Sequence, residues 1–119
     1  GVTHQDIDMA MIYDSFTITV VETLEDLGFC QKGEGGDFVS GGRLQVGGEL
    51  PINTDGGGLS SNHPGMRGIF LLLEATRQLR NQFEGTPRQV PNCRVALCHG
   101  TGGTLATRHS GGTVILGRD

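Results

Sequence analysis

Residues 7–28 read IDMAMIYDSFTITVVETLEDLG, and this stretch carries the strongest fold signal in the chain. The run from Ile7 to Ile12 is short, apolar and bounded by acidic residues, which is typical of a strand covered on both faces. Tyr13 and Asp14 follow directly, so we place them at the carboxyl end of that strand. In open α/β sheets this edge is where ligands bind.

A helix is predicted directly after this strand. Asp14 or Ser15 offers an N-cap oxygen, and Gly28 supplies a helix stop. Between these limits, apolar side chains recur at three- and four-residue spacing at Phe16, Val20, Leu24 and Leu27. The chain therefore opens with a strand followed by a helix.

Length and composition exclude several classes of protein. The 119 residues fit one domain of common size. Hydrophobic residues make up only 35%, but 21 glycines explain part of this, and 18% charged residues do not indicate disorder. A net charge of −4 without any Lys/Arg run disfavours nucleic-acid binding. No apolar run approaches the length of a membrane span, and no secretory signal opens the chain.

The three cysteines are Cys30, Cys93 and Cys98, an odd number with neither a CxxC motif nor metal-ligand spacing. We therefore expect no disulfide framework and a reducing, cytoplasmic compartment. Cys93 and Cys98 are five residues apart in a strand-like run, which predicts that they face opposite sides of it. The chain starts at Gly1 rather than at methionine, which we interpret as a piece of a longer protein.

The middle of the chain contains a glycine-rich segment and a second helix. Ten of the 21 glycines lie between Gly33 and Gly58, which indicates either a linker or a loop whose backbone approaches something closely. Its apolar residues Phe38, Val46, Leu50 and Ile52 argue against a pure linker. Pro64 fits the first turn of the next helix, which we expect to be buried nearly all round at its middle. Its apolar stripe is Met66, Ile69, Phe70, Leu73 and Leu79, opposite Glu74, Arg77, Gln78 and Arg80.

The C-terminal third reads as a loop and two strands. Residues 80–92 are polar and contain two prolines, and Arg94 to Cys98 is a candidate buried strand. His99 to Gly103 is predicted to be a turn, and Thr113 to Leu116 a last short strand. The predicted order is thus strand, helix, glycine loop, helix, strand, strand.

Three short elements bring reactive side chains to loop positions: Tyr13-Asp-Ser-Phe16, Asn62-His-Pro-Gly65 and Cys98-His-Gly-Thr-Gly-Gly103. Each has an ordinary structural interpretation: a core tyrosine with a wet hydroxyl, a helix-capping histidine, or a core cysteine beside a turn histidine. The last glycine run opens no amphipathic helix and is not followed by GKS or GKT, so a nucleotide site is weakly supported. The His and acidic residues show no metal-ligand spacing, so no metal site is predicted.

The order of these elements resembles the C-terminal half of thiolases. In that family an Asn/His-Glu-Ala-Phe element is followed by Asn-x-x-Gly-Gly, Gly-His-Pro and Cys-x-Gly. Here the matching residues are Tyr13-Asp-Ser-Phe16, Asn53-Thr-Asp-Gly-Gly57, Asn62-His63-Pro64 and Cys98-His99-Gly100. The sequences of the Tyr-Asp-Ser-Phe and His-Gly-Thr-Gly-Gly motifs are most similar to the branch that contains sterol-carrier-protein-x and lipid-transfer-protein-like thiolases. The resemblance covers nearly the whole chain, so residues 1–119 are expected to form one thiolase-like C-terminal domain, an α/β domain with a mixed central sheet covered by helices.

The resemblance implies a role for each matched residue. His63 would serve the nucleophilic cysteine of the other half and help bind the thioester oxygen. Cys98 would be the acid/base that exchanges a proton with the α-carbon, and Tyr13 replaces the Asn or His that holds an oxyanion-hole water. Asn53, Gly100 and Gly102 would contribute to substrate binding. Claisen chemistry needs such an acid/base and donors where an enolate oxygen develops.

Several departures leave the reaction open. The acyl-accepting cysteine belongs to an N-terminal half that this chain lacks, and Asn62 replaces a glycine. His99 follows Cys98, so either could be the acid/base, although only Cys98 matches the Cys-x-Gly spacing. We expect one of the two, preferably Cys98, to point into a cleft shared with Tyr13 and His63. A phenol at Tyr13 with an imidazole at His99 would also suit retro-aldol cleavage of a β-hydroxyacyl-CoA.

The resemblance therefore predicts part of an acyltransferase, a 3-ketoacyl-CoA thiolase or acetyl-CoA acyltransferase that makes or breaks a carbon–carbon bond. The alternatives are a retro-aldolase, a lipid-transfer or acyl-CoA-binding protein, and an inert half used for dimerisation. No cofactor is expected beyond the coenzyme A of the substrate. The expected partners are acyl-CoA, the missing N-terminal half and a second copy in a homodimer, with neither nucleic acid nor a membrane span.

Overall fold

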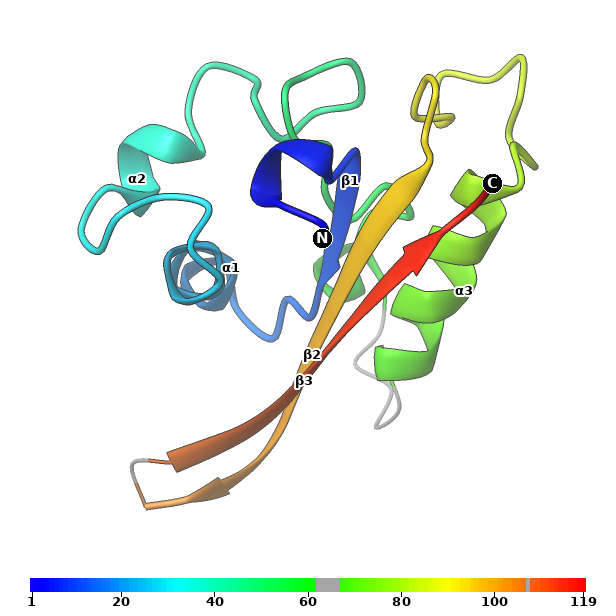
Figure 1. The fold of residues 1–119 in the computed structure, drawn as a ribbon. Coiled ribbons are helices and arrows are strands. Elements are labelled where there is room, and N and C mark those ends of the chain that lie inside the picture. The colour runs from blue at the N-terminus through cyan, green and yellow to red at the C-terminus, as the bar shows by residue number, and fades with distance from the viewer. Residues whose placement is uncertain (62–66, 107) are drawn as a thin grey trace.

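The computed structural model describes residues 1–61, 67–106 and 108–119. Helices lie on both sides of a central sheet (Figure 1). The elements are η1 (His4–Asp6), β1 (Met9–Ile12), α1 (Thr17–Asp26), α2 (Gly35–Phe38), η2 (Gly58–Ser60), α3 (Arg67–Leu79), β2 (Val95–Leu105) and β3 (Arg108–Gly117). The predicted fold class and, apart from the short extra helices, the predicted order of elements are confirmed.

The sheet has the order β1-β2-β3, with β1 parallel to β2 and β2 antiparallel to β3. The parallel register runs from Met9 opposite Ala96 to Ile12 opposite His99. All four residues of β1 are buried, as the apolar run predicts. On the edge of β1 that does not face β2, an isolated bridge joins Ala10 to Ile52. This bridge places the end of the glycine-rich segment alongside the sheet.

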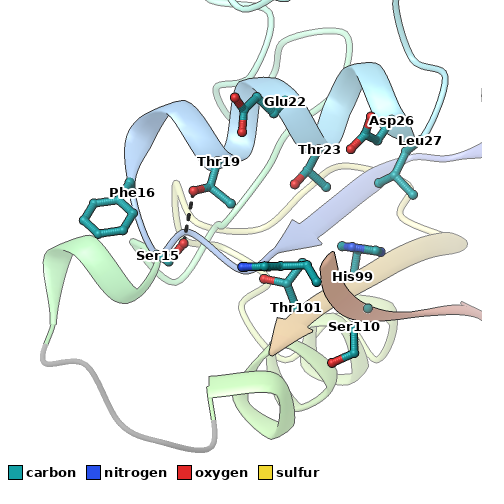
Figure 2. A pocket seen from close by; sticks show the side chains of 12 residues that line it. Ser15, Phe16, Thr19, Glu22, Thr23, Asp26, Leu27, His99, Thr101 and Ser110 are labelled. Carbon is teal, nitrogen blue, oxygen red and sulfur yellow. Dashed lines mark hydrogen bonds between the residues drawn. The ribbon is translucent and has the colours of Figure 1, made fainter. Parts of the chain in front are cut away.

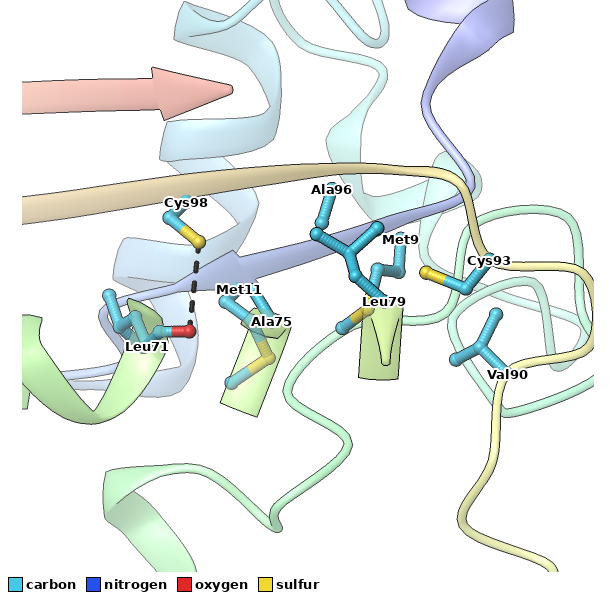
Figure 3. Close-up of a cluster of buried hydrophobic side chains, with 9 residues drawn as sticks. All are labelled: Met9, Met11, Leu71, Ala75, Leu79, Val90, Cys93, Ala96 and Cys98. Atoms are coloured by element: carbon cyan, nitrogen blue, oxygen red, sulfur yellow. Dashed lines mark hydrogen bonds between the residues drawn. The ribbon is translucent and has the colours of Figure 1, made fainter. Parts of the chain in front are cut away.

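Alternation along the strands sorts the core into two clusters, one on each face of the sheet. The cluster under α3 contains Met9, Met11, Leu71, Ala75, Leu79, Val90, Cys93, Ala96 and Cys98 (Figure 3). The cluster under α1 contains Ile7, Ala10, Ile12, Leu24, Leu50 and Leu97. Phe38 and Ile52 also pack against this second cluster, so the glycine-rich segment is anchored rather than a free linker. Val46 is 38% exposed, and its predicted anchoring role is wrong.

The start of α1 differs from the prediction. Its N-cap residue is Phe16, which makes no side-chain capping bond and is 68% exposed instead of packing with Leu24. The Asp14 carboxylate is used elsewhere, because it accepts hydrogen bonds from the distant backbone of Gly58 and Leu59. The predicted stop is confirmed, since Gly28 has a positive φ of 83° just after the helix.

The glycines after Cys98 do not form the predicted turn. Residues 99–103 continue β2, and β3 begins at Arg108 rather than at Thr113. The two strands place Gly100 opposite Gly112, so partner pairing keeps this glycine-rich stretch extended despite its weak intrinsic preference. A register shift between Gly102 and Thr104 contains Gly103, whose φ of 62° suits a bulge. The distal half of the hairpin projects away from the helical layers (Figure 1).

Helix α3 packs on the core with Leu71, Ala75 and Leu79, and most of the predicted apolar stripe points away from it. Ile69, Phe70 and Leu73 are 51%, 43% and 45% exposed, whereas Glu74 and Gln78 are buried. The prediction of a helix buried all round at its middle is therefore wrong, although Leu79 is buried as expected. Pro64 and Met66 lie outside the described residues.

A hydrogen-bond network makes this polar face of α3 compatible with burial. The Glu74 carboxylate accepts bonds from the Thr54 hydroxyl at 2.7 Å and the Arg88 guanidinium at 2.5 Å. The Gln78 amide donates to the Arg88 carbonyl at 2.9 Å and accepts from the Val90 N–H at 2.9 Å. Buried polar groups are tolerated when they are satisfied in this way. The network thus ties the loop after α3 to the helix.

The prediction that Cys93 and Cys98 face opposite sides is wrong. Cys93 precedes β2, where strand alternation does not apply, and both thiols lie in the cluster under α3 (Figure 3). All three cysteines are free. Among the described residues, no helix has the length and apolar character needed to cross a bilayer.

Candidate active site

Tyr13 lies just beyond the carboxyl end of β1, where the strand prediction places it. Its backbone N–H donates to the His99 carbonyl at 2.9 Å, which extends the parallel pairing by one residue. The tyrosine side chain is half-buried and packs against the cluster under α3. The end of β1 and the middle of β2 are therefore adjacent, as a shared site requires.

Cys98 faces the protein core. Its side chain is 4% exposed, and its Sγ lies 3.6 Å from the Leu71 carbonyl oxygen of α3 (Figure 3). Burial raises the pKa of this thiol to about 11. In this arrangement Cys98 is a protonated thiol that does not reach solvent.

His99 points to the other face of the sheet, because successive strand residues alternate. It lines a hollow of about 680 Å³ between α1 and the β2–β3 hairpin (Figure 2). Tyr13 packs against the cluster that contains Cys98, whereas His99 lies on the other face. Whether Cys98 or His99 points into a cleft shared with Tyr13 and His63 stays a prediction, because His63 lies outside the described residues. The sequence spacing matches the motif, but the parity of β2 decides which side chain is open.

The His99 ring is held in a defined place within this hollow. Its Nδ1 lies 2.8 Å from the Thr113 hydroxyl of the paired strand. The ring also lies over Gly111, where a Cβ would be 3.2 Å from Nε2. Burial lowers the pKa of His99, so the neutral imidazole dominates at neutral pH. A neutral imidazole with one nitrogen bonded to a hydroxyl can act as a base through the other.

The wall opposite His99 is polar and partly acidic. Helix α1 contributes Thr19, Glu22, Thr23 and Asp26 (Figure 2). Asp26 also forms an ion pair with Lys32. No three His, Cys, Asp or Glu side chains in residues 1–61, 67–106 and 108–119 come together as metal ligands.

Tyr13 lines a second hollow, of about 650 Å³, together with Asp14, Gly58, Leu59 and Gly102. Among the residues that the structure describes, Ser15, Phe16, Thr101 and His109 line both hollows. The hollows lined by His99 and by Tyr13 therefore adjoin along these residues, and they are two depressions rather than one cleft.

The three predicted substrate-binding residues have different surroundings. Asn53 Oδ1 accepts the Ile12 N–H at 2.9 Å, and its backbone N–H donates to Ala10, so its side-chain oxygen extends the edge of β1. Gly100 lies near α3, because a Cβ built on it would be 4.0 Å from the Gly68 Cα. Gly102 lines the Tyr13 hollow.

His63 lies outside the described residues, so its convergence with Tyr13 and the Cys98–His99 pair stays a prediction. Sequence reasoning missed Thr101 and His109, which line both hollows. Thr101 is two residues after His99 and would share its face of a continued strand. The glycines on either side of Thr101 indicated a turn, so the strand that places Thr101 beside His99 was not predicted.

A family profile described as thiolase C-terminal domain-like matches residues 1–118. This chain belongs to the thiolase C-terminal domain family. The match spans almost the entire chain, and it agrees with the motif order from Tyr13 to Gly100.

The relatives of this thiolase C-terminal domain are named for different activities, which include an aldolase and an acetyltransferase. A steroid side-chain-cleaving aldolase from Thermomonospora curvata is 44% identical over 103 residues, covering 86% of this chain and 25% of its own. An acetyl-CoA acetyltransferase from Methanothermobacter thermautotrophicus is 39% identical over 106 residues, covering 88% and 27%. The solved structure of an Ltp2–ChsH2(DUF35) aldolase has a TM-score of 0.78 and 36% identity, covering 98% of this chain and 28% of that one. The chain therefore spans about a quarter of the length of these proteins.

Ile69, Phe70 and Leu73 form an apolar stripe on α3 that is exposed in this structure. We expect the isolated 119-residue chain to self-associate and bind a hydrophobic dye through Ile69, Phe70 and Leu73. A Leu73→Lys variant should reduce that association, whereas Arg80→Lys, an exposed change just past the end of the same helix, should not. Size-exclusion chromatography with light scattering measures both. A monomer at millimolar concentration without dye binding would contradict this expectation.

Proposed function

We propose that this chain is the C-terminal domain of a thiolase-fold enzyme that cleaves a carbon–carbon bond of a β-hydroxyacyl-CoA by a retro-aldol reaction. The supporting observation is the opposite placement of neighbouring residues: His99 lines an open hollow while Cys98 is buried with a pKa of about 11. Acid–base catalysis favours a group whose pKa lies near the working pH. His99 meets this condition better than Cys98.

The retro-aldol reaction needs only proton transfers from such groups. A base accepts the proton of the β-hydroxyl, the Cα–Cβ bond breaks, and its electron pair forms the enolate of the shortened acyl-CoA. The β-carbon leaves as a ketone or aldehyde, and an acid protonates the enolate carbon. We assign the base role to the His99 imidazole and the acid role to the Tyr13 phenol. No acyl-cysteine is required.

The surroundings of the two hollows favour different parts of the substrate. Glu22 and Asp26 make the His99 hollow unsuitable for the phosphates of coenzyme A. The Tyr13 hollow is bordered by Phe16 and Leu59, which are 68% and 55% exposed, and it suits an apolar acyl group. The name of the T. curvata relative, a steroid side-chain-cleaving aldolase, fits a bulky apolar acyl group.

The second candidate is Claisen chemistry by a 3-ketoacyl-CoA thiolase. The Cys98-His-Gly100 motif and the similarity to an acetyl-CoA acetyltransferase favour it. In that mechanism Cys98 would exchange the α-carbon proton and His63 would serve an acyl-accepting cysteine outside this chain. A domain that only carries or binds acyl groups is the remaining alternative, as is one that serves dimerisation. A homodimer and a cytoplasmic location remain part of the proposal.

The deciding experiment uses the complete protein that contains this chain. It is incubated separately with a β-hydroxyacyl-CoA and with acetoacetyl-CoA plus coenzyme A, and products are separated by chromatography with mass detection. We expect a ketone or aldehyde and a shortened acyl-CoA from the first mixture only. Turnover confined to the second would support the thiolase, and turnover in neither would support a carrier.

The isolated 119-residue chain is expected to show no turnover in either mixture. A composite site loses most of its rate when one contributing part is absent, and this chain spans about a quarter of its relatives. The same chromatographic assay measures it. Rates close to those of the complete protein would overturn this expectation.

A further inference from the structure

The carboxylate of Asp14 connects the end of β1 to a distant turn. Asp14 is 5% exposed, and its two oxygens accept backbone N–H groups of Gly58 at 2.7 Å and of Leu59 at 3.1 Å. These donors are more than 40 residues away in the sequence. Because both oxygens of one buried side chain bond the backbone of a distant segment, this contact links two parts of the chain.

The glycine run is shaped around this carboxylate. Gly57 has a positive φ of 73°, and a Cβ built on it would overlap the Asp14 Oδ2 atom. A Cβ on Gly58 would lie 3.0 Å from Asp14 Oδ1. Glycine is therefore required at Gly57 for two independent reasons, conformation and close approach.

The turn is also fastened on its far side. The Asp55 carboxylate accepts the Gly57 N–H at 2.9 Å and pairs with the Arg67 guanidinium at 2.7 Å. Arg67 is the first residue of α3 and is 6% exposed. Asp14 thus joins β1 to a turn that is itself attached to the start of α3.

We propose that Asp14 is a positioning residue that fixes Tyr13 in its hollow. Tyr13, Asp14, Gly58 and Leu59 all line that hollow, and the Asp14 side chain bonds the backbone of the wall opposite the end of β1. Loss of the link lets this wall and the adjacent phenol move apart. This inference rests on the proposed function, because it assumes that Tyr13 acts on substrate.

The first test replaces Asp14 by asparagine in the complete protein. The amide keeps the shape of the carboxylate but presents an NH₂ group to one of the two N–H donors. We expect kcat per folded enzyme to fall by about 100-fold with KM within about twofold, since a displacement near 1 Å has such an effect on a reacting group. Asp37→Asn, at an exposed acid of α2, should leave both constants unchanged. An Asp14→Asn enzyme with unchanged kcat per folded molecule would overturn the proposal.

A double-mutant cycle tests whether Asp14 and Gly57 act through the same contact. Gly57→Ala should displace the carboxylate and lower kcat to a similar extent. The double variant should then be no more than about threefold worse than the more damaging single variant. If the loss of kcat in the double variant equalled the product of the losses in the two single variants, Asp14 and Gly57 would not act through one contact.

A measurement without substrate separates this proposal from the proposed function. The complete protein is labelled with 3-fluorotyrosine, and the Tyr13 signal is assigned by its loss in Tyr13→Phe. Asp14→Asn should shift or broaden that fluorine resonance, and Asp37→Asn should leave it unchanged. An unmoved Tyr13 signal overturns the positioning role even if the enzyme is an aldolase. A moved signal in a protein without lyase activity supports the link while the proposed function fails.

Discussion

Replacing His99 by asparagine in the complete protein is expected to lower kcat for retro-aldol cleavage by about 10²–10⁴-fold, the usual contribution of a general acid–base group. Asparagine removes the titrating nitrogen but can still bond the Thr113 hydroxyl that holds the ring. The matched control is Cys98→Ala, next in sequence but facing the core, which should change kcat by less than about threefold. Steady-state kinetics per folded enzyme measure both.

The pH profile gives a second readout for the same residue. Because burial lowers the pKa of His99 below 6.5, the neutral base persists to more acidic pH than a solvated histidine would. The acidic limb of kcat/KM should therefore lie below pH 6.5. If Cys98→Ala abolished turnover and His99→Asn did not, the reaction would be the thiolase one.

Replacing Glu74 by alanine is expected to lower the free energy of unfolding by about 3 kcal/mol, the lower end of the range for breaking a buried ion pair. Glu74 is 3% exposed and bonds Thr54, Gln78 and Arg88, so its loss leaves several buried groups without their acceptor. The lower end applies because Arg88 is 39% exposed and can be rehydrated. Denaturant titration of the complete protein, followed by a probe in this domain, measures the change.

Glu84→Ala is the control, because Glu84 is exposed and should change stability by less than about 0.5 kcal/mol. Burial opposes ionisation of Glu74, but hydrogen bonds from Arg88, Thr54 and Gln78 outweigh it and lower its pKa. A lowered folded-state pKa gives stability that is present above the ordinary glutamate pKa and lost as pH falls through the folded value. Glu74→Gln should therefore lose less stability on acidification than the wild type. Equal acid sensitivity would contradict the role of the ionised network.

The sequence was most informative where a local pattern and the fold agreed. The apolar run before Tyr13 predicted β1, and the three- and four-residue spacing of apolar side chains up to Gly28 predicted α1. The order of motifs from Tyr13 to Gly100 indicated the thiolase C-terminal family, which the match over residues 1–118 confirmed. Motif order is a property of the chain itself, so it needs no tertiary information.

The sequence identified the residues of the candidate site but not the directions in which their side chains point. Cys98 and His99 are neighbours, and only the parity of β2 relative to α3 decides that the thiol is buried and the imidazole open. The same stretch is predicted to turn at His99, because its glycines have little intrinsic preference for a strand. Pairing of Gly100 with Gly112 overrides that preference.

What the sequence alone determined is the family, the class of fold and the residue types available for chemistry. Tertiary structure alone decided which face of α3 is covered. Hydropathy favoured burying Ile69, Phe70 and Leu73, yet Leu71, Ala75 and Leu79 are the α3 residues that pack with the strands. Glu74 and Gln78 are buried too, because Thr54, Arg88 and the backbone of Val90 satisfy their polar atoms. Hydrophobic periodicity records that a face is apolar, but it does not record which neighbour is present to bury it. The partners of Glu74 and Gln78 in other segments lie 10 to 24 residues away, so no local pattern contains them.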